Sequence, residues 1–210
     1  SGAAEERFER AISETFGARI AVRLEDTDIL IKVRIARNLV IISLETSGTA
    51  LHKRGFKHAM GKAPLRETIA AMTLRACGFK WKEPLLDPMC GSGTYPIEAA
   101  EMAGNLMSGR DRRFAFEKLV SYDADAVQTM KNDWFTREPP AHFYGFDKNA
   151  DVIESATANA ARAGVGDTCH FASGTLSKLT APDGPPGLVI VNPPYGERIG
   201  NKKELFGLYQ

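Results

Sequence analysis

The sequence predicts an α/β fold whose main part is a doubly wound parallel sheet, preceded by a smaller α+β segment. Two observations lead to this class. Short apolar runs typical of buried strands alternate with helical stretches along most of the chain. A glycine turn at residues 91–93 joins one such strand directly to a helix, and prolines at 193 and 194 end another strand.

The first 48 residues are expected to form part of a small α+β domain. Residues 4–16 carry Phe8, Ile12 and Phe16 at helical spacing. Three β-rich runs, residues 20–24, 29–35 and 39–44, predict strands, and Arg37-Asn38 predicts the turn between the last two. One helix and three strands are too few for a complete domain of this kind, so we expect its N-terminal portion to be missing.

A Gly- and Lys-rich linker is expected over residues 49–64, followed by the larger domain at residues 65–210. This domain begins with a helix at 66–77, which we expect to use Ile69, Met72 and Leu74 as its apolar positions. The next predicted elements, in order, are a strand ending at residue 87, a helix from about 95, a strand at 142–147, a helix at 150–163 closed by Gly164, and strands at 169–172 and 188–191. We expect the last strand to be fully buried, because it is short and β-branched.

The glycine turn predicts a cofactor loop. Gly91 and Gly93 allow the backbone to approach a ligand without a clash from Cβ, and Pro96 stands in the first turn of the helix, where proline is tolerated. No third glycine completes a dinucleotide fingerprint, and no Gly-Lys-Ser/Thr forms a phosphate loop. The loop therefore favours a ligand with little phosphate, and S-adenosyl-L-methionine fits that description.

Asp147 ends the strand at 142–147 and is the candidate for binding the two ribose hydroxyls of a nucleoside. The alternative for Asp147 alone is an N-cap for the following helix. The prediction of ribose binding depends on its combination with the glycine loop.

Asn192 and the Pro-Pro-Tyr that follows it predict a rigid shelf at the carboxyl end of a strand, where open α/β sheets bind ligands. The Asn192 side-chain oxygen and the Pro193 carbonyl can accept both hydrogens of an exocyclic amino group, while Tyr195 stacks on the base. Taken alone, the tetrapeptide favours a proline turn after a core strand, and it is the glycine loop upstream that reverses this preference.

With these motifs in order, residues from about 50 to 210 resemble the class I S-adenosylmethionine-dependent methyltransferases. More narrowly, they resemble the THUMP-associated RNA methylase family, whose bacterial members methylate the N2 amino group of guanosine in large-subunit ribosomal RNA. The matching segments are residues 87–94, 145–147 and 192–195, together with residues 46–56, which match the family's junction between THUMP and catalytic domains.

The resemblance implies a class I methyltransferase (Rossmann-like) sheet with three strands beyond the Asn-Pro-Pro-Tyr strand. Residues 196–210 are too few for them, so we expect the sheet to lack its last strands, the strand at 188–191 to lie at an apolar edge, and the chain to be part of a longer protein.

The resemblance also implies the roles of individual residues. Ser173 stands where such enzymes often place an acidic residue against adenine, and Cys90 is expected to be a packed loop residue, because no Pro-Cys nucleophile motif occurs. No metal is expected. The catalytic residues are Asn192, Pro193 and Tyr195, and the cofactor-binding residues are Asp87, Pro88, Met89, Cys90, Gly91, Gly93, Thr94, Asp147, Lys148, Ser173 and Asn192.

Composition is compatible with a cytoplasmic RNA enzyme. The three cysteines have no C-x-x-C spacing, and no apolar run approaches the roughly 18 residues of a membrane span. A net charge of +1 means that RNA, expected to be ribosomal or alternatively transfer RNA, must be bound by local patches. The candidates are residues 52–62 and 109–116, where cations and aromatics alternate, although solvated loops with buried phenylalanines would give the same pattern. We favour a monomer.

Three alternatives remain open at this point. DNA adenine-N6 methylases and protein-glutamine methylases share the Asn-Pro-Pro-Tyr chemistry, and the THUMP-like first part of the chain favours RNA over both. The third alternative is a non-catalytic RNA-binding module. The presence of Asp87, both loop glycines, Asp147 and Asn192 argues against it.

Overall fold

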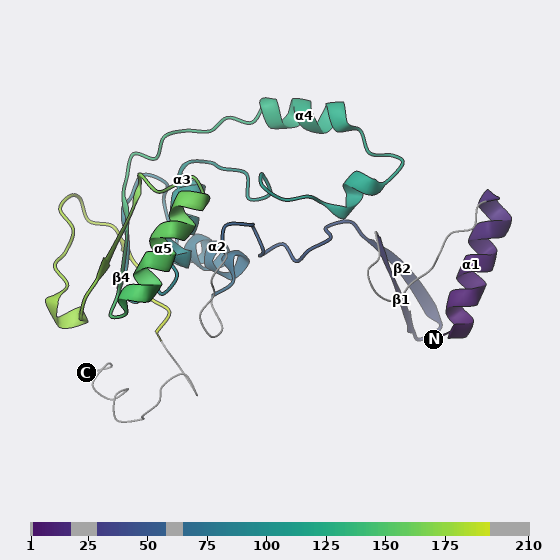
Figure 1. Cartoon of the computed structure of the whole chain (residues 1–210), viewed down its shortest axis with the longest axis horizontal. Helices are drawn as coiled ribbons and strands as arrows, with labels where there is room; N and C mark the ends of the chain where they lie inside the picture. Colours follow the sequence, from purple (N-terminus) through teal and green to yellow (C-terminus); the bar gives the residue numbers. More distant parts are fainter. Residues whose placement is uncertain (1, 18–28, 58–64, 194–210) are drawn as a thin grey trace, which may run out of the picture. The chain divides into compact units, whose positions relative to one another are not determined.

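The computed structural model describes residues 2–17, 29–57 and 65–193. It divides into two compact units (Figure 1). The first comprises residues 1–49 and 113–124, and the second comprises residues 50–112 and 125–210. The predicted strand at 20–24 and the segment 194–210, which includes Tyr195, lie outside the described residues.

The first unit contains helix α1 (Gly2–Phe16) and an antiparallel hairpin of β1 (Leu30–Ala36) and β2 (Leu39–Glu45). The hairpin turn predicted at Arg37-Asn38 is confirmed, and both residues have positive φ, as a tight two-residue turn requires. The short 3-10 helix η1 (Ala115–Lys118) joins this unit, because the Phe116 amide donates to the Thr46 carbonyl at 3.0 Å.

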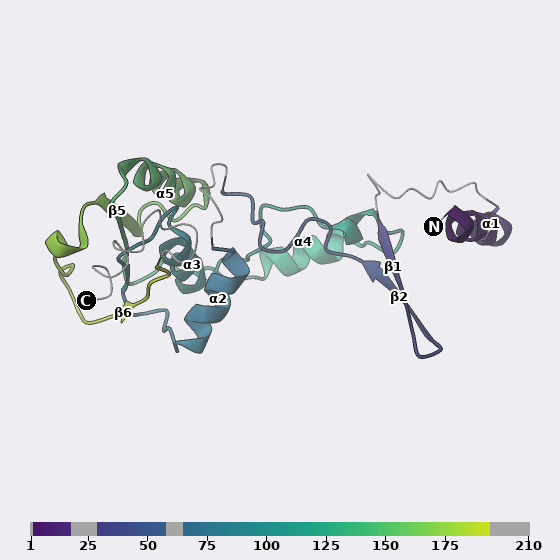
Figure 2. The same ribbon diagram turned by 90° about the horizontal axis from the view of Figure 1, so that it is seen from below.

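The second unit is built on a parallel sheet, which in the described residues has the order β5-β4-β3-β6 (Figure 2). The strands are β3 (Leu85–Asp87), β4 (Phe143–Asp147), β5 (Cys169–Ser173) and β6 (Leu188–Val189). The chain moves outward from β3 to β5 and then crosses to the other side of β3. This reversal confirms the doubly wound topology and creates a switch point between β3 and β6, where such sheets bind ligands.

Helices α2 (Glu67–Ala76), α3 (Thr94–Ala103) and α5 (Ala150–Arg162) pack in this unit. Helices α3 and α5 contact β4 and β5, and α2 contacts α3. Helix α4 (Ala124–Asn132) was not predicted from the sequence; it has nine residues and none of them is buried. A short 3-10 helix, η2 (Leu176–Lys178), follows β5. No helix of the described residues is long and apolar enough to cross a membrane.

The core of the second unit lies between the sheet and its helices. Leu85 and Phe143 on the strands, Ile97 on α3 and Leu74 on α2 are its largest fully buried apolar side chains. They come from the strands and helices that the sequence predicted, so the alternating apolar runs did identify the layers of this fold.

The predicted apolar face of the first helix in this unit is only partly correct. Leu74 and Ala70 are fully buried, whereas Ile69 and Met72 are 48% and 70% exposed. The neighbour of α2 is another helix, α3, rather than the sheet. The buried stripe is therefore narrow and includes Glu67, whose partner is a cation described below.

The expectation of a fully buried last strand is wrong. Only Leu188 and Val189 form the strand, and exposure alternates from Val189 (64% exposed) to Ile190 (8% exposed). In the described sheet β6 has one neighbour, β3, so it lies at an apolar edge, as expected from the sequence.

Candidate active site

Four predicted site residues come together because the carboxyl ends of parallel strands share one edge of the sheet. Asp87 ends β3, Asp147 ends β4 and Ser173 ends β5, with Asp147 and Ser173 paired in register. Past the end of β6, the Ile190 amide still donates to the Leu86 carbonyl at 3.0 Å. Asn192 therefore follows at the same edge, half-buried beside Pro193.

The loop from β3 to α3 is closed by its own backbone and by Asp147. The Gly93 amide donates to the Cys90 carbonyl at 2.9 Å, and the Cys90 amide donates to the Phe146 carbonyl at 2.7 Å. Gly91 and Gly93 have φ of 51° and 83°, a region that favours glycine. Pro88 and Met89 lie half-buried between them and Asp87. The backbone conformation thus explains why both glycines are needed.

Asp147 holds two loops through its carboxylate. Its Oδ2 accepts from the Gly91 amide at 3.1 Å, and its Oδ1 accepts from the Asn149 amide at 3.0 Å. The helix N-cap is Asn149, whose side chain accepts from the Asp151 amide, so the alternative of Asp147 as the N-cap is wrong. The carboxylate lies beside the glycine loop, and Lys148 after it is exposed.

Asp87 is buried with an unusual electrostatic environment. Its Oδ1 accepts from the Met89 amide at 3.0 Å. The pKa of Asp87 is raised to about 7, mainly by burial and also by the negative charge of Asp147, against the lowering effect of the Met89 hydrogen bond. Two carboxylates in one site favour a ligand that brings positive charge.

Cys90 is a packed residue and has the properties of an unreactive thiol. It is buried, and its pKa is raised by burial and by the charges of Asp87 and Asp147, so the thiolate that a covalent mechanism needs is disfavoured. A Cβ on Gly145 of the neighbouring strand would come within 2.8 Å of the Cys90 sulfur. Gly145 is therefore required for the loop to pack on β4.

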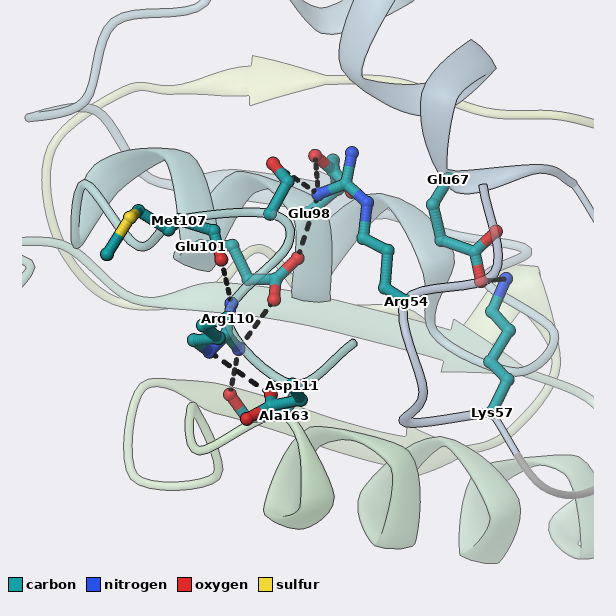
Figure 3. Close-up of polar contacts among 10 residues, drawn as sticks. Arg54, Lys57, Glu67, Glu98, Glu101, Met107, Arg110, Asp111 and Ala163 are labelled. Carbon is teal, nitrogen blue, oxygen red and sulfur yellow. Dashed lines mark hydrogen bonds and ion pairs between the residues drawn. The ribbon is translucent and has the colours of Figure 1, made fainter. Parts of the chain in front are cut away.

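The basic segments do not behave as one RNA-binding surface. Arg54 and Lys57 are buried in ion pairs with Glu98, Glu101 and Glu67, so the expectation that they contact RNA is wrong (Figure 3). His58 and Lys62 lie outside the described residues. These ion pairs were not predicted from the sequence, although glutamates at 98 and 101 in an otherwise alanine-rich helix were their signal.

The second basic segment is divided in the same way. Arg110 donates to the Ala163 carbonyl at 2.6 Å and pairs with Glu101 at 2.7 Å (Figure 3). Arg112 donates to the Ala50 carbonyl at 3.3 Å, and Arg113 is exposed, with Glu117 at 3.0 Å. Only Arg112 and Arg113 of this segment therefore stay candidates for contact with RNA.

Comparison with known proteins places these features in a family. A family model described as "RMKL-like, methyltransferase domain" matches residues 54–210. The ribosomal RNA large subunit methyltransferase K/L of Vibrio campbellii is 40% identical over 193 residues, which make up 88% of this chain and 27% of that protein. The chain thus spans about a quarter of the length of the curated relatives it matches.

Solved structures have the same fold. The crystal structure of SMU.472 with bound SAH aligns with a TM-score of 0.86 at 27% identity, over 99% of this chain and 55% of that one. A predicted N6-adenine-specific DNA methylase from Listeria monocytogenes aligns with a TM-score of 0.79 at 33% identity, over 97% of this chain and 54% of that one. Both alignments extend over nearly the whole chain.

Proposed function

Because the chain belongs to the family of RMKL-like methyltransferase domains, we propose that it transfers a methyl group from S-adenosyl-L-methionine to an exocyclic amino group in RNA. The proposed acceptor is N2 of guanine in large-subunit ribosomal RNA. The observation that carries this proposal is the meeting of the glycine loop, Asp147 and Asn192 at one edge of the sheet. The printed name of the Vibrio relative supports ribosomal RNA as the substrate.

The residues at this edge fit the proposed cofactor. Bound S-adenosyl-L-methionine would supply an electrophilic methyl group on a sulfonium. Asp147, beside the Gly91 amide, is placed to accept hydrogen bonds from ribose hydroxyls. Asp87 is buried without an ion pair among the described residues, and a cationic group would compensate its charge. The SAH bound to SMU.472 supports the same choice.

Asn192 and Pro193 would activate the acceptor by orienting it. An exocyclic amine is a poor nucleophile because its lone pair is delocalised into the ring. Hydrogen bonds from the amine to the Asn192 Oδ1 and the Pro193 carbonyl favour a more tetrahedral nitrogen, whose lone pair then points at the methyl group. Orientation of this kind is worth several kcal/mol of the barrier, on the order of 5. No strong base is needed, because the leaving thioether is neutral and the proton can be lost late.

A second candidate is adenine-N6 methylation of DNA. The printed description of the Listeria neighbour favours it, and Asn-Pro-Pro-Tyr chemistry suits either base. The resemblance of residues 1–48 to part of a THUMP domain is the feature that supports RNA.

Mass spectrometry of digested ribosomal and transfer RNA from a deletion strain tests the proposal. We expect one N2-methylguanosine to be lost, to return with the natural full-length protein, and not to return with its Asn192→Ala variant. Asn192→Ala should leave most of the affinity for S-adenosyl-L-methionine, because Asn192 is only one of the predicted cofactor contacts and the glycine loop, Asp87 and Asp147 are unchanged.

Digested genomic DNA from the same strain separates the two candidates. Loss of N6-methyladenine from DNA, with RNA unchanged, would establish the second candidate. Full restoration of methylguanosine by Asn192→Ala would refute the role given to Asn192.

A further inference from the structure

The segment expected to be a linker contributes a buried lysine to the cofactor loop. Lys57 donates to the Thr94 hydroxyl at 2.8 Å and to the Leu65 carbonyl at 3.0 Å, and it pairs with Glu67 at 3.3 Å (Figure 3 shows the ion pair). An ammonium has three donors, and three acceptors surround this one. The side chain of Lys57 is 5% exposed, so these contacts replace water rather than compete with it.

This contact fixes the polarity of the Thr94 hydroxyl. Because an ammonium can only donate, the Thr94 oxygen must accept from Lys57, and the hydroxyl proton is left to donate elsewhere. Thr94 directly follows Gly93 and is the first residue of α3, within the proposed cofactor loop. The contact with Lys57 therefore leaves the proton of the buried Thr94 hydroxyl available for another acceptor.

A second chain of contacts joins the same segment to the other side of the loop. Arg162 donates from Nε to the Phe56 carbonyl at 2.7 Å and from Nη2 to the Asn159 Oδ1 at 2.5 Å. The Asn159 side chain is buried and donates to the Ser92 carbonyl at 3.1 Å. Phe56 is thus linked to Ser92 through Arg162 and Asn159, and Lys57 contacts Thr94 directly.

Arg54 anchors the segment to the body of α3. Its guanidinium lies 2.8 Å from Glu98 and 3.2 Å from Glu101, and it donates to the Ser108 hydroxyl at 3.0 Å (Figure 3). The two glutamates lie one turn apart on α3, so Arg54 holds the helix that begins at Thr94. This anchor leaves the segment little freedom to move away from the loop.

We propose that Lys57 is a positioning residue of the cofactor site, which holds the start of α3 and presents the Thr94 hydroxyl as a donor to the cofactor. The inference rests on the proposed function, because it assumes that the cofactor occupies the 87–94 loop. It assigns to residues 54–57 a part in cofactor affinity rather than in RNA contact.

Calorimetry with S-adenosyl-L-homocysteine and the natural full-length protein tests the inference. Lys57→Met should raise the Kd by about tenfold, since it removes a charged hydrogen bond from a buried hydroxyl. Lys57→Arg should recover part of the affinity. The KM for S-adenosyl-L-methionine should rise with the Kd, while the KM for RNA stays unchanged. The same substitution at exposed Lys80, Lys80→Met, is the matched control and should leave the Kd unchanged.

Thr94 variants separate positioning from a merely structural role. Thr94→Val should weaken binding, Thr94→Ser should preserve it, and adding Lys57→Met to Thr94→Val should cause little further loss. These Thr94 variants also carry the test if Lys57→Met does not fold. An unchanged Kd in folded Lys57→Met, even with a lowered Tm, or an unchanged Kd in Thr94→Val, would overturn the inference. Failure of the wild-type protein to bind would instead overturn the proposed function.

Discussion

Asp87 is a buried carboxyl group that destabilises the fold when it is ionised and that we propose contacts a cationic group of the cofactor. The carboxyl group is buried at the end of β3, with Asp147 nearby, and its pKa rises from 3.8 to about 7. The folded state therefore holds the proton more tightly than the unfolded state. Its contribution to stability is fully present below pH 4 and is lost as the pH rises through about 7. Above about pH 7 the ligand-free protein is therefore less stable with Asp87 than it would be with a neutral residue at this position.

We predict that Asp87→Asn stabilises the cofactor-free protein at pH 8 by ~1–3 kcal/mol, because the amide carries no charge to bury. The gain should shrink as the pH falls below about 7, because the folded wild-type carboxyl is then protonated and buries no charge. The same variant should bind S-adenosyl-L-homocysteine more weakly at pH 8. Chemical denaturation across this pH range and calorimetry measure the two effects.

Asp167→Asn is the control for this prediction, because Asp167 is an exposed carboxylate in the same unit. It should change neither stability nor affinity with pH. A loss of stability in Asp87→Asn at pH 8 would contradict the assignment of Asp87 as a destabilising buried charge.

At the scale of the elements, the cofactor loop depends on close packing between β4 and its neighbours. A Cβ on Gly145 would lie 2.6 Å from the Phe171 ring and 2.8 Å from the Cys90 sulfur. A Cβ on Gly93 would likewise lie 2.9 Å from the Phe171 ring. One aromatic ring on β5 thus packs against both glycines, so the shape of the loop is decided by its neighbours as well as by its own sequence.

We predict that Gly145→Ala lowers the unfolding free energy by ~1–3 kcal/mol and weakens cofactor binding, because Phe171 or Cys90 must move away from β4. Adding Phe171→Leu should recover part of the stability. Gly166→Ala is the matched control, since a Cβ there meets its nearest atom at 3.5 Å, an ordinary contact. Equal stability of Gly145→Ala and Gly166→Ala in thermal unfolding would contradict this account of the packing.

At the scale of the whole molecule, the distribution of cations is more informative than the net charge of +1. Arg54, Lys57 and Arg110 lie in partly or fully buried ion pairs within the methyltransferase unit, where their charges are paired with buried glutamates. Arg112 and Arg113 follow them in sequence, and Arg113 is exposed. RNA affinity is therefore expected to depend on fewer cations than the sequence contains.

We predict that the double variant Arg112→Glu and Arg113→Glu weakens binding to RNA across different sequences. The slope of log affinity against log salt should fall by about 1 for each RNA phosphate that the variant no longer neutralises. Titration of RNA at several salt concentrations measures both effects. The control is a double variant with the same change of charge elsewhere, Arg75→Glu on α2 with Lys80→Glu after it. An unchanged slope in the Arg112→Glu, Arg113→Glu variant would exclude residues 112–113 from the RNA-binding surface.

Local signals were sufficient for the fold class and for placing the predicted site residues at one edge of the sheet. Strand, glycine turn and helix follow each other directly at residues 85–103, and each carboxyl-end residue is adjacent in sequence to its strand. Parallel pairing then brings those ends together without further information. The sequence failed for α4, a short helix that buries none of its residues, and for Ile69 and Met72, because periodicity does not specify which neighbour α2 packs against.

The sequence by itself determined the order of the elements, the two loop glycines and the acids at the ends of β3 and β4, because these depend on neighbours within a few residues. Only the tertiary structure decided which charges are buried. Glu98 and Glu101 meet Arg54 across more than forty residues of chain, as Lys57 meets Thr94 across 37. Charge pairing over such separations leaves no periodic signal, so a segment that resembles a basic linker is instead packed against the cofactor loop.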